Sequence, residues 1–206
     1  QKFACLQLPI IGGADSSLKE SLAAFVKPEK MEGENQVECQ EAANAKFDAL
    51  RRDWLAELPE LLIVHLKRWE FDYQTFLMKK NNNFCHFPME LDVADYTHSS
   101  SYVKQQGTTM YILSGILIHR GPAGGGHYYS IIKDRETGQW YKFNDESVTK
   151  FNIHDISKES FGKDDGDQSA YMLFYDFQPT SSNKMPCLSV VDRNSMDEDA
   201  VIVDKK

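Results

Sequence analysis

The residues best suited to chemistry in this chain are one histidine and one asparagine. His127 directly follows the glycine-rich segment RGPAGGG (120–126), and Asn144 ends the segment QWYKFN (139–144). The apolar, aromatic-rich segments that carry them are typical of β-strands, and residues 135–138 between them have the composition of a turn. The midpoint of 127 and 144 is 135.5, inside that turn. A tight antiparallel hairpin therefore predicts that the two side chains face each other to within about one residue.

Such a pair has a specific chemical use. Directly opposed residues have Cβ atoms roughly 5 Å apart, close enough for a side-chain hydrogen bond. The amide oxygen of Asn144 would accept from one imidazole nitrogen of His127, leaving the other nitrogen to face a nucleophile. This is the base-and-orienter half of a Cys-His-Asn triad. The same pair is also compatible with plain structure, and a glycine-rich loop with an ordinary hairpin connection.

Composition excludes several classes of function. The 206 residues carry a formal net charge of −8, which argues against a nucleic-acid partner because such proteins need a basic surface. No apolar run approaches the roughly 18 residues of a membrane span. The four cysteines, Cys5, Cys39, Cys85 and Cys187, are scattered, so they indicate neither a disulfide framework nor a closed zinc site. We expect reduced thiols in a cytosolic or nuclear protein.

The elements expected to position the pair are mostly β-strands. A capping serine at 16 or 17 predicts a short helix that ends before Pro28, and the alanine-rich residues 39–56 favour a second helix. A helical turn is expected within 154–161. Strands are expected at 3–11, 61–71, 84–87, 110–119, 127–133, 139–144 and 170–177. Residues 179–206 turn polar and acidic and are interpreted as a flexible tail that follows a folded part, 1–178.

Four segments together resemble the ubiquitin-specific protease family. They are LPELLIVHLKRW (59–69), YILSGILIHRGPAGGGHYYSIIKD (111–134), QWYKFNDESVTKF (139–151) and AYMLFYD (170–176). They occur in the family's order, and the resemblance covers most of residues 3–177. It implies an α+β, papain-like cysteine protease fold, of which this chain holds mainly the antiparallel β palm and part of the fingers, without the thumb half.

The resemblance also implies roles for individual residues. His127 would be the general base, Asn144 the third triad member, and Asp145 a second acidic residue near the oxyanion region. The loop 120–126 matches a mobile loop beside the channel for the C-terminal tail of ubiquitin. The residues expected along that channel are His119, Gly125, Gly126 and Tyr128. A tail that ends in two glycines needs a channel too narrow for side chains, which favours backbone-lined walls.

Two family features are missing from the sequence. The cysteine box that supplies the nucleophile has no counterpart here, so the resemblance implies that it lies N-terminal to this chain, in the rest of the catalytic domain. The second C-x-x-C pair of the fingers keeps Cys39, but Ala42 stands where its partner is expected. One thiolate cannot complete a tetrahedral structural site. We therefore expect no cofactor, and no zinc unless further ligands come from outside this chain.

Three functions compete. The first is a thiol deubiquitinase that cleaves after the C-terminal Gly-Gly of ubiquitin and acts on ubiquitinated proteins. The second is a catalytically inactive ubiquitin-binding module that lacks the cysteine box. The third is a β-rich interaction domain with an accidental His/Asn pair, which the detailed resemblance disfavours. The retention of both His127 and Asn144 favours the enzyme, because a pure binding module has no need of them.

Overall fold

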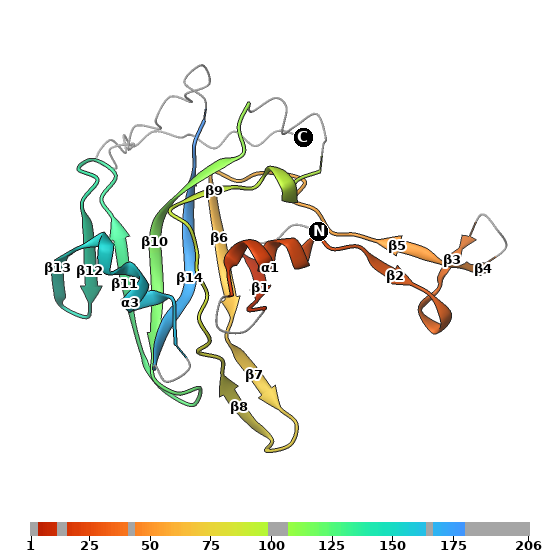
Figure 1. Cartoon of the computed structure of the whole chain (residues 1–206), viewed down its shortest axis with the longest axis horizontal. Coiled ribbons are helices and arrows are strands. Elements are labelled where there is room, and N and C mark those ends of the chain that lie inside the picture. The colour runs from red at the N-terminus through yellow and green to blue at the C-terminus, as the bar shows by residue number, and fades with distance from the viewer. Residues whose placement is uncertain (1–3, 12–15, 41–43, 99–106, 164–166, 180–206) are drawn as a thin grey trace, which may run out of the picture.

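The computed structural model of the chain describes residues 4–11, 16–40, 44–98, 107–163 and 167–179. Its main feature is one large sheet (Figure 1). The strands of this sheet are β1 (Leu6–Pro9), β6 (Leu61–Lys67), β9 (Glu90–Asp92), β10 (Met110–Arg120), β11 (His127–Lys133), β12 (Trp140–Asn144), β13 (Ser147–Phe151) and β14 (Gln168–Phe177). Their order is β1-β6-β14-β10-β11-β12-β13, with β9 also paired to β10. Only β1 and β6 run parallel; the other pairs of this sheet are antiparallel.

Short helices accompany the sheet. Helix α1 (Leu18–Phe25) begins at Ser17, whose hydroxyl accepts from the Glu20 backbone N–H while the Glu20 carboxylate accepts from the Ser17 N–H. This reciprocal capping confirms the predicted helix start. The remaining helical elements of the described residues are α3 (Ile156–Ser160) and the 3-10 turns η1 (Gly33–Asn35), η3 (Ala94–Tyr96) and η4 (Ile153–Asp155). None of the helices in the described ranges is long and apolar enough to cross a membrane.

Two structures project from the sheet (Figure 1). The first, which we call the arm, pairs β2 (Glu29–Met31) with β5 (Ala49–Arg51) and β3 (Val37–Cys39) with β4 (Ala45–Phe47). The second is the hairpin of β7 (Trp69–Asp72) and β8 (Leu77–Lys80). The predicted helix over 39–56 is therefore wrong. Alanine favours helix only weakly, and strand pairing within the arm overrides that preference.

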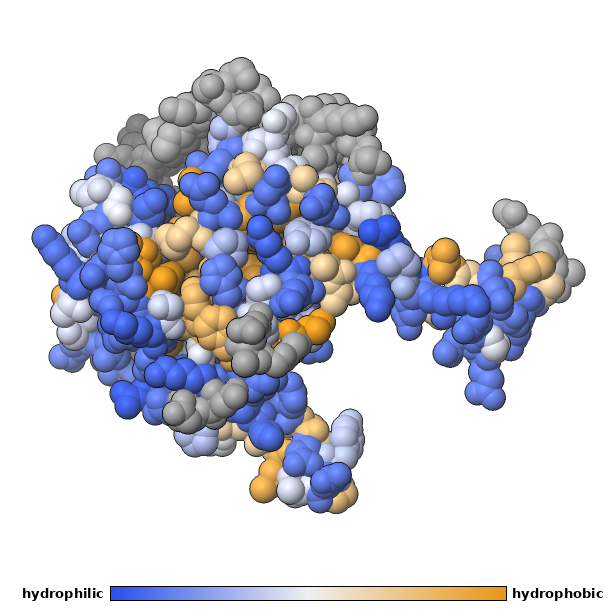
Figure 2. All heavy atoms as spheres, viewed as in Figure 1, coloured by the Kyte–Doolittle hydropathy of each residue, from blue (hydrophilic) through white to orange (hydrophobic). Residues whose placement is uncertain are grey.

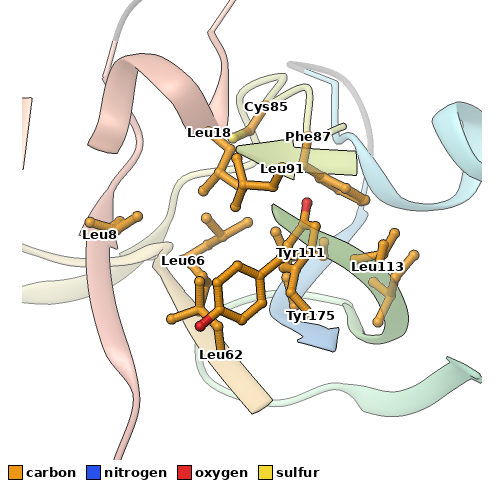
Figure 3. Packing of buried hydrophobic residues seen from close by; sticks show 14 of the residues in the cluster. Leu8, Leu18, Leu62, Leu66, Cys85, Phe87, Leu91, Tyr111, Leu113 and Tyr175 are labelled. Atoms are coloured by element: carbon orange, nitrogen blue, oxygen red, sulfur yellow. The ribbon is translucent and has the colours of Figure 1, made fainter. Parts of the chain in front are cut away.

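The core lies between α1 and the first strands of the sheet and continues under β9, β10 and β14 (Figure 3). Leucine side chains from α1, β1 and β6 meet there, and two buried tyrosines point their hydroxyls at backbone. The Tyr111 hydroxyl donates to the Pro59 carbonyl at 2.7 Å and the Tyr175 hydroxyl to the Pro88 carbonyl at 2.8 Å. Burial raises the pKa of Tyr175 well above its usual value. Both polar tips are thus satisfied inside an apolar core.

A fully buried arginine separates β6 from β7. The Arg68 side chain has an exposed fraction of 0%, and its Nε donates to the Ala170 carbonyl at 2.6 Å. Its Nη1 donates to the carbonyls of Asn81 and Asn83, both at 3.0 Å. Burial lowers the pKa of Arg68 to about 10. The single strand predicted over 61–71 is therefore broken here, and the hairpin β7–β8 branches away from the sheet.

Most of the other predicted strands are present in the structure, and one is not. The predicted strands 110–119, 127–133, 139–144 and 170–177 are confirmed as β10, β11, β12 and β14. The strand predicted at 84–87 is wrong, because His86 makes only an isolated bridge to Ser17. Strand β13 follows a two-residue turn and was not predicted. The tail predicted for 179–206 lies outside the described residues except for Pro179.

Candidate active site

His127 stands at the start of β11, where the glycine-rich loop enters the sheet, and Asn144 stands at the end of the neighbouring strand β12. The Nε2 atom of His127 lies 2.5 Å from the Oδ1 atom of Asn144. Because an amide oxygen only accepts, Nε2 carries the hydrogen of this bond. The expected contact between the two side chains is therefore present in the structure.

The register that creates this contact differs from the predicted one. Ser130 pairs with Phe143 and Lys133 with Trp140, so the hairpin is centred one residue beyond the predicted midpoint. His127 and Asn144 are consequently diagonal neighbours rather than directly opposed. Diagonal pairs of an antiparallel ladder stay within reach of long side chains. The cause is the turn, where the Asp134 carboxylate accepts from two backbone N–H groups and Gly138 has a φ of 72°.

Asp145 is positioned by the next turn. Asn144 pairs with Ser147, leaving Asp145 and Glu146 as a two-residue connection between β12 and β13. The φ of Asp145 is 51°, a left-handed conformation that aspartate tolerates better than most residues. Its Oδ2 lies 3.6 Å from His127 Nε2, and 76% of its side chain is exposed. Asp145 thus places a negative charge beside the imidazole, on the same side as the Asn144 amide.

The geometry assigns the two ring nitrogens of His127 different tasks. Nε2 is held by Asn144 and faced by Asp145, whereas no hydrogen bond to Nδ1 is formed within the described part of the chain. The His127 side chain is 44% exposed, so a reacting group can approach the ring. An oriented imidazole of this kind can take a proton from a thiol and return it to a leaving amine.

His119, which was expected beside the substrate channel, lies beneath the loop. Only 3% of the residue is exposed, and its ring packs against Trp69 at 4.9 Å and Tyr128 at 4.8 Å between centroids. Burial, and then the charge of Lys80, lower the pKa of His119. The buried ring of His119 therefore supports the loop from below. Its contact with substrate stays a prediction.

The other expected channel residues lie at the surface. Tyr128 is 47% exposed, and its ring also lies 5.7 Å from that of Tyr171. Gly126 covers His119: a Cβ added to Gly126 would collide with His119 Nε2 and with the Arg120 carbonyl. Gly125, in contrast, has no heavy atom within 4 Å of an added Cβ. Only one of these two neighbouring glycines is therefore required by packing.

This difference predicts the outcome of a paired substitution. Gly126→Ala is expected to lower the free energy of unfolding by about 1–2 kcal/mol, because the loop must lift from His119 or the ring must move. Gly125→Ala is expected to change it by less than about 0.5 kcal/mol. Urea denaturation of the two variants measures the difference. Equal destabilisation would show that the loop does not pack on His119 as described.

A residue that sequence reasoning missed lies behind the loop. Lys80, the last residue of β8, is 9% exposed and reaches three backbone carbonyls near His119. Its neighbour Lys79 is exposed, and the sequence alone presents the two as equivalent surface charges. The alternation of a strand would separate them, but the apolar pattern around them does not show which one points inward.

The described residues include three cysteines. Cys85 is fully buried, and burial raises the pKa of its thiol. Cys5 and Cys39 are partly exposed. None of these thiols hydrogen-bonds to His127, and Cys187 lies outside the described residues. No group of three or more His, Cys, Asp or Glu side chains suited to a metal ion occurs among the described residues. Cys39 alone does not fit a structural zinc ion.

Known proteins of one family are similar to this chain in sequence. The family model described as "Ubiquitin carboxyl-terminal hydrolase" matches residues 17–175. Ubiquitin carboxyl-terminal hydrolase 48 of Gallus gallus is 40% identical over 150 residues, which cover 72% of this chain and 14% of the relative. Ubiquitin carboxyl-terminal hydrolase 9X of Mus musculus is 34% identical over 175 residues, which cover 71% of this chain and 7% of the relative.

A solved structure shares the fold. It is a chain of the SAGA Ubp8/Sgf11/Sus1/Sgf73 DUB module bound to ubiquitin aldehyde, with a TM-score of 0.68 and 30% sequence identity. The match covers 86% of this chain and 36% of that chain. The present chain therefore spans a minor part of each of these proteins. The family model matches residues 17–175, most of the described sheet, so the chain belongs to the ubiquitin carboxyl-terminal hydrolase family, as a C-terminal part of the papain-like catalytic domain of a ubiquitin-specific protease family member.

Proposed function

We propose that this chain supplies the general base and its orienting partner to a thiol-dependent deubiquitinase whose nucleophilic cysteine lies N-terminal to it. The observation that carries the proposal is the hydrogen bond from His127 Nε2 to Asn144 Oδ1, in a half-exposed side chain whose Nδ1 forms no hydrogen bond within the described residues. An imidazole held by an amide at one nitrogen is suited to activating a thiol at the other. Membership of the family supports the same reading.

The proposed reaction is acyl transfer in two steps. Nδ1 of His127 takes the proton of the cysteine thiol, and the thiolate attacks the carbonyl of the terminal glycine of ubiquitin. The tetrahedral intermediate collapses as the C–N bond breaks, and the lysine amine leaves with the proton from the imidazolium. Water, deprotonated by His127, then attacks the thioester. The thiolate leaves, is reprotonated by the imidazolium, and the carboxyl group of ubiquitin is released.

Asn144 sets the electrostatics of this cycle. It orients the ring but contributes no charge to stabilise the imidazolium, unlike an aspartate in that place. A thiol tolerates this, because cysteine is far more acidic than serine and rests readily as a thiolate beside an imidazolium. The Asp145 carboxylate, 3.6 Å from Nε2, supplies part of the missing charge. It is 76% exposed, so solvent screens much of its effect.

The surface of the chain supports a protein as substrate. Exposed apolar side chains gather on both projections of the sheet (Figure 2). Those on the arm and on the hairpin β7–β8 are Val37, Phe47, Leu50, Phe71, Tyr73, Phe76, Leu77 and Met78. Exposed apolar groups of this extent favour contact with a protein surface. Ubiquitin is the partner that the family assignment supports, and the solved relative is described as bound to ubiquitin aldehyde.

The competing function is a ubiquitin-binding module without activity, which is favoured by the fact that no thiol meets His127 within the described residues. The deciding experiment treats the complete protein, expressed from its full reading frame, with ubiquitin that carries a C-terminal electrophile. We expect covalent labelling of one cysteine upstream of Gln1, and no turnover by the 206-residue chain alone. Binding of ubiquitin without labelling would favour the module, and turnover by the isolated chain would refute an upstream nucleophile.

A further inference from the structure

Lys80 connects two segments of backbone beside the proposed active site. Its Nζ donates to the carbonyls of Asp167 at 2.8 Å, His119 at 3.0 Å and Gly121 at 3.2 Å. An ammonium has three N–H donors, so its hydrogen-bonding capacity is fully used. His119 and Gly121 flank the start of the glycine-rich loop, and Asp167 directly precedes β14. One buried cation therefore joins both segments.

We propose that Lys80 is a positioning residue, whose ammonium fixes the shape of the loop 120–126 and thereby the placement of His127 at its end. The inference rests on the proposed function and assigns a task to a residue whose hydrogen bonds go to backbone carbonyls rather than to His127. Lys80 acts through the backbone of the loop rather than on the reacting atoms.

The ladder between β10 and β14 already pairs Arg120 with Gln168, and two contacts besides Lys80 join the segments beyond it. The Gly121 N–H donates to the Asp167 carbonyl at 2.8 Å, and Arg120 Nε lies 3.0 Å from Asp167 Oδ2. The side chains of that ion pair are 61% and 58% exposed, and an exposed pair contributes little. Charge-assisted hydrogen bonds away from water are stronger. The Lys80 ammonium is therefore the strongest side-chain tether where the loop leaves the ladder.

The tether reaches the far end of the loop through His119. Lys80 holds the His119 carbonyl, the His119 ring supports Gly126, and His127 follows Gly126 directly. Both ends of the loop are thus held through His119. The middle of the loop is not packed in this way, because an added Cβ at Gly124 or Gly125 would meet nothing within 4 Å. A general base works only when its ring is held close to the productive geometry. Loosening the start of the loop therefore affects the base at its end.

Protonation controls the tether. The charged groups facing Lys80 are Arg68, Asp167 and, when protonated, His119. Burial, and then Arg68, lower the pKa of Lys80 to about 8, while Asp167 opposes the shift. A neutral amine keeps only two N–H donors for three carbonyls, so the tether weakens as pH rises through about 8.

The lowered pKa also affects the stability of the whole fold. Lys80 loses its proton at lower pH in the folded state than in the unfolded state, so its titration raises the free energy of unfolding between about pH 8 and 10.5. As pH rises above about 8, the local tether thus weakens while the global stability of the fold increases.

The test compares Lys80→Met with Lys79→Met in the complete protein. Lys79 is exposed and pairs across the hairpin with Glu70, which makes it a matched control. We expect kcat/KM of the wild type for a ubiquitin substrate to decline above about pH 8. Lys80→Met is expected to lower kcat/KM about tenfold at pH 7 and to abolish this decline. Lys79→Met is expected to stay within about twofold and to keep that decline. An unchanged pH profile in Lys80→Met would overturn the proposal.

Amide hydrogen exchange tests the tether without turnover, so its result is independent of the proposed function. In Lys80→Met, protection is expected to fall in 119–127 and to stay constant in β6. Unchanged protection of the loop, or an equal loss throughout the sheet, would overturn a positioning role. If Lys80→Met does not fold, hydrogen exchange of the wild-type protein at several pH values provides the test instead. The protection factors of its loop are expected to drop as pH rises above about 8. A flat profile there would contradict the proposal.

Discussion

Replacement of His127 by alanine is expected to lower kcat/KM of the complete protein for a ubiquitin substrate by about 10³-fold or more. The substitution removes the group that takes the thiol proton and returns it to the leaving amine. Asn144→Ala is expected to cost less, about 10–100-fold, because the imidazole remains and Asp145 still faces it at 3.6 Å. Release of a fluorophore from the C-terminus of ubiquitin measures both effects.

The control for this comparison is His154→Ala. His154 lies in the turn η4, is exposed, and has no place in the proposed reaction, so its loss should leave kcat/KM within about twofold. A loss in Asn144→Ala equal to that in His127→Ala would refute the assigned roles. It would mean that the ring works only when the amide holds it, and that Asp145 contributes nothing.

Arg68→Ala is expected to lower the free energy of unfolding by about 2–4 kcal/mol. The substitution leaves the carbonyls of Ala170, Asn81 and Asn83 without their donor, at a cost of about 1–3 kcal/mol for each one that water cannot reach. The vacated volume adds a cavity term. Relief from burying a cation offsets part of the loss. Urea denaturation monitored by circular dichroism measures the change.

Two further variants sharpen this prediction. Arg68→Lys should recover less than half of the loss, because one ammonium cannot reach carbonyls on both sides as the planar guanidinium does. Arg135→Ala removes an arginine that is 73% exposed and paired with Asp176, and should cost less than about 1 kcal/mol. Full recovery by lysine would show that the charge at this position, rather than the three directed hydrogen bonds, stabilises the fold.

The His127–Asn144 pair could be predicted from sequence because hairpin geometry is local. Strand composition and a turn between the two residues were enough to bring them together, although the register was centred one residue too early. That error has a local cause, since Gly138 and the Asp134 side chain fix a longer turn than the composition indicated. The contact forms despite this shift of register, because the side chains of diagonal neighbours are long enough to reach each other.

The wrongly predicted helix and the missed buried cations depend on contacts between segments far apart in the sequence. Residues 39–56 form strands because the arm pairs β2 with β5 and β3 with β4, and alanine content does not reveal that pairing. The buried cations Arg68 and Lys80 were missed for the same reason. Their carbonyl partners come from segments up to about 100 residues away, and only the folded chain brings these segments to the side chains. Sequence pattern predicts strands well and buried charges poorly.

The pairing of β6 with β14 has a consequence for biosynthesis. Val64 of β6 pairs with Leu173 of β14, so the ribosome must add about 100 residues after β6 before its antiparallel partner exists. At about 5–20 residues per second this takes about 5–20 s. During this time β1 can cover one edge of β6, because it is already synthesised, while the other edge stays open. The nascent chain thus presents an apolar, unpaired strand to the cell, and a chaperone that shields it would raise the yield of folded protein.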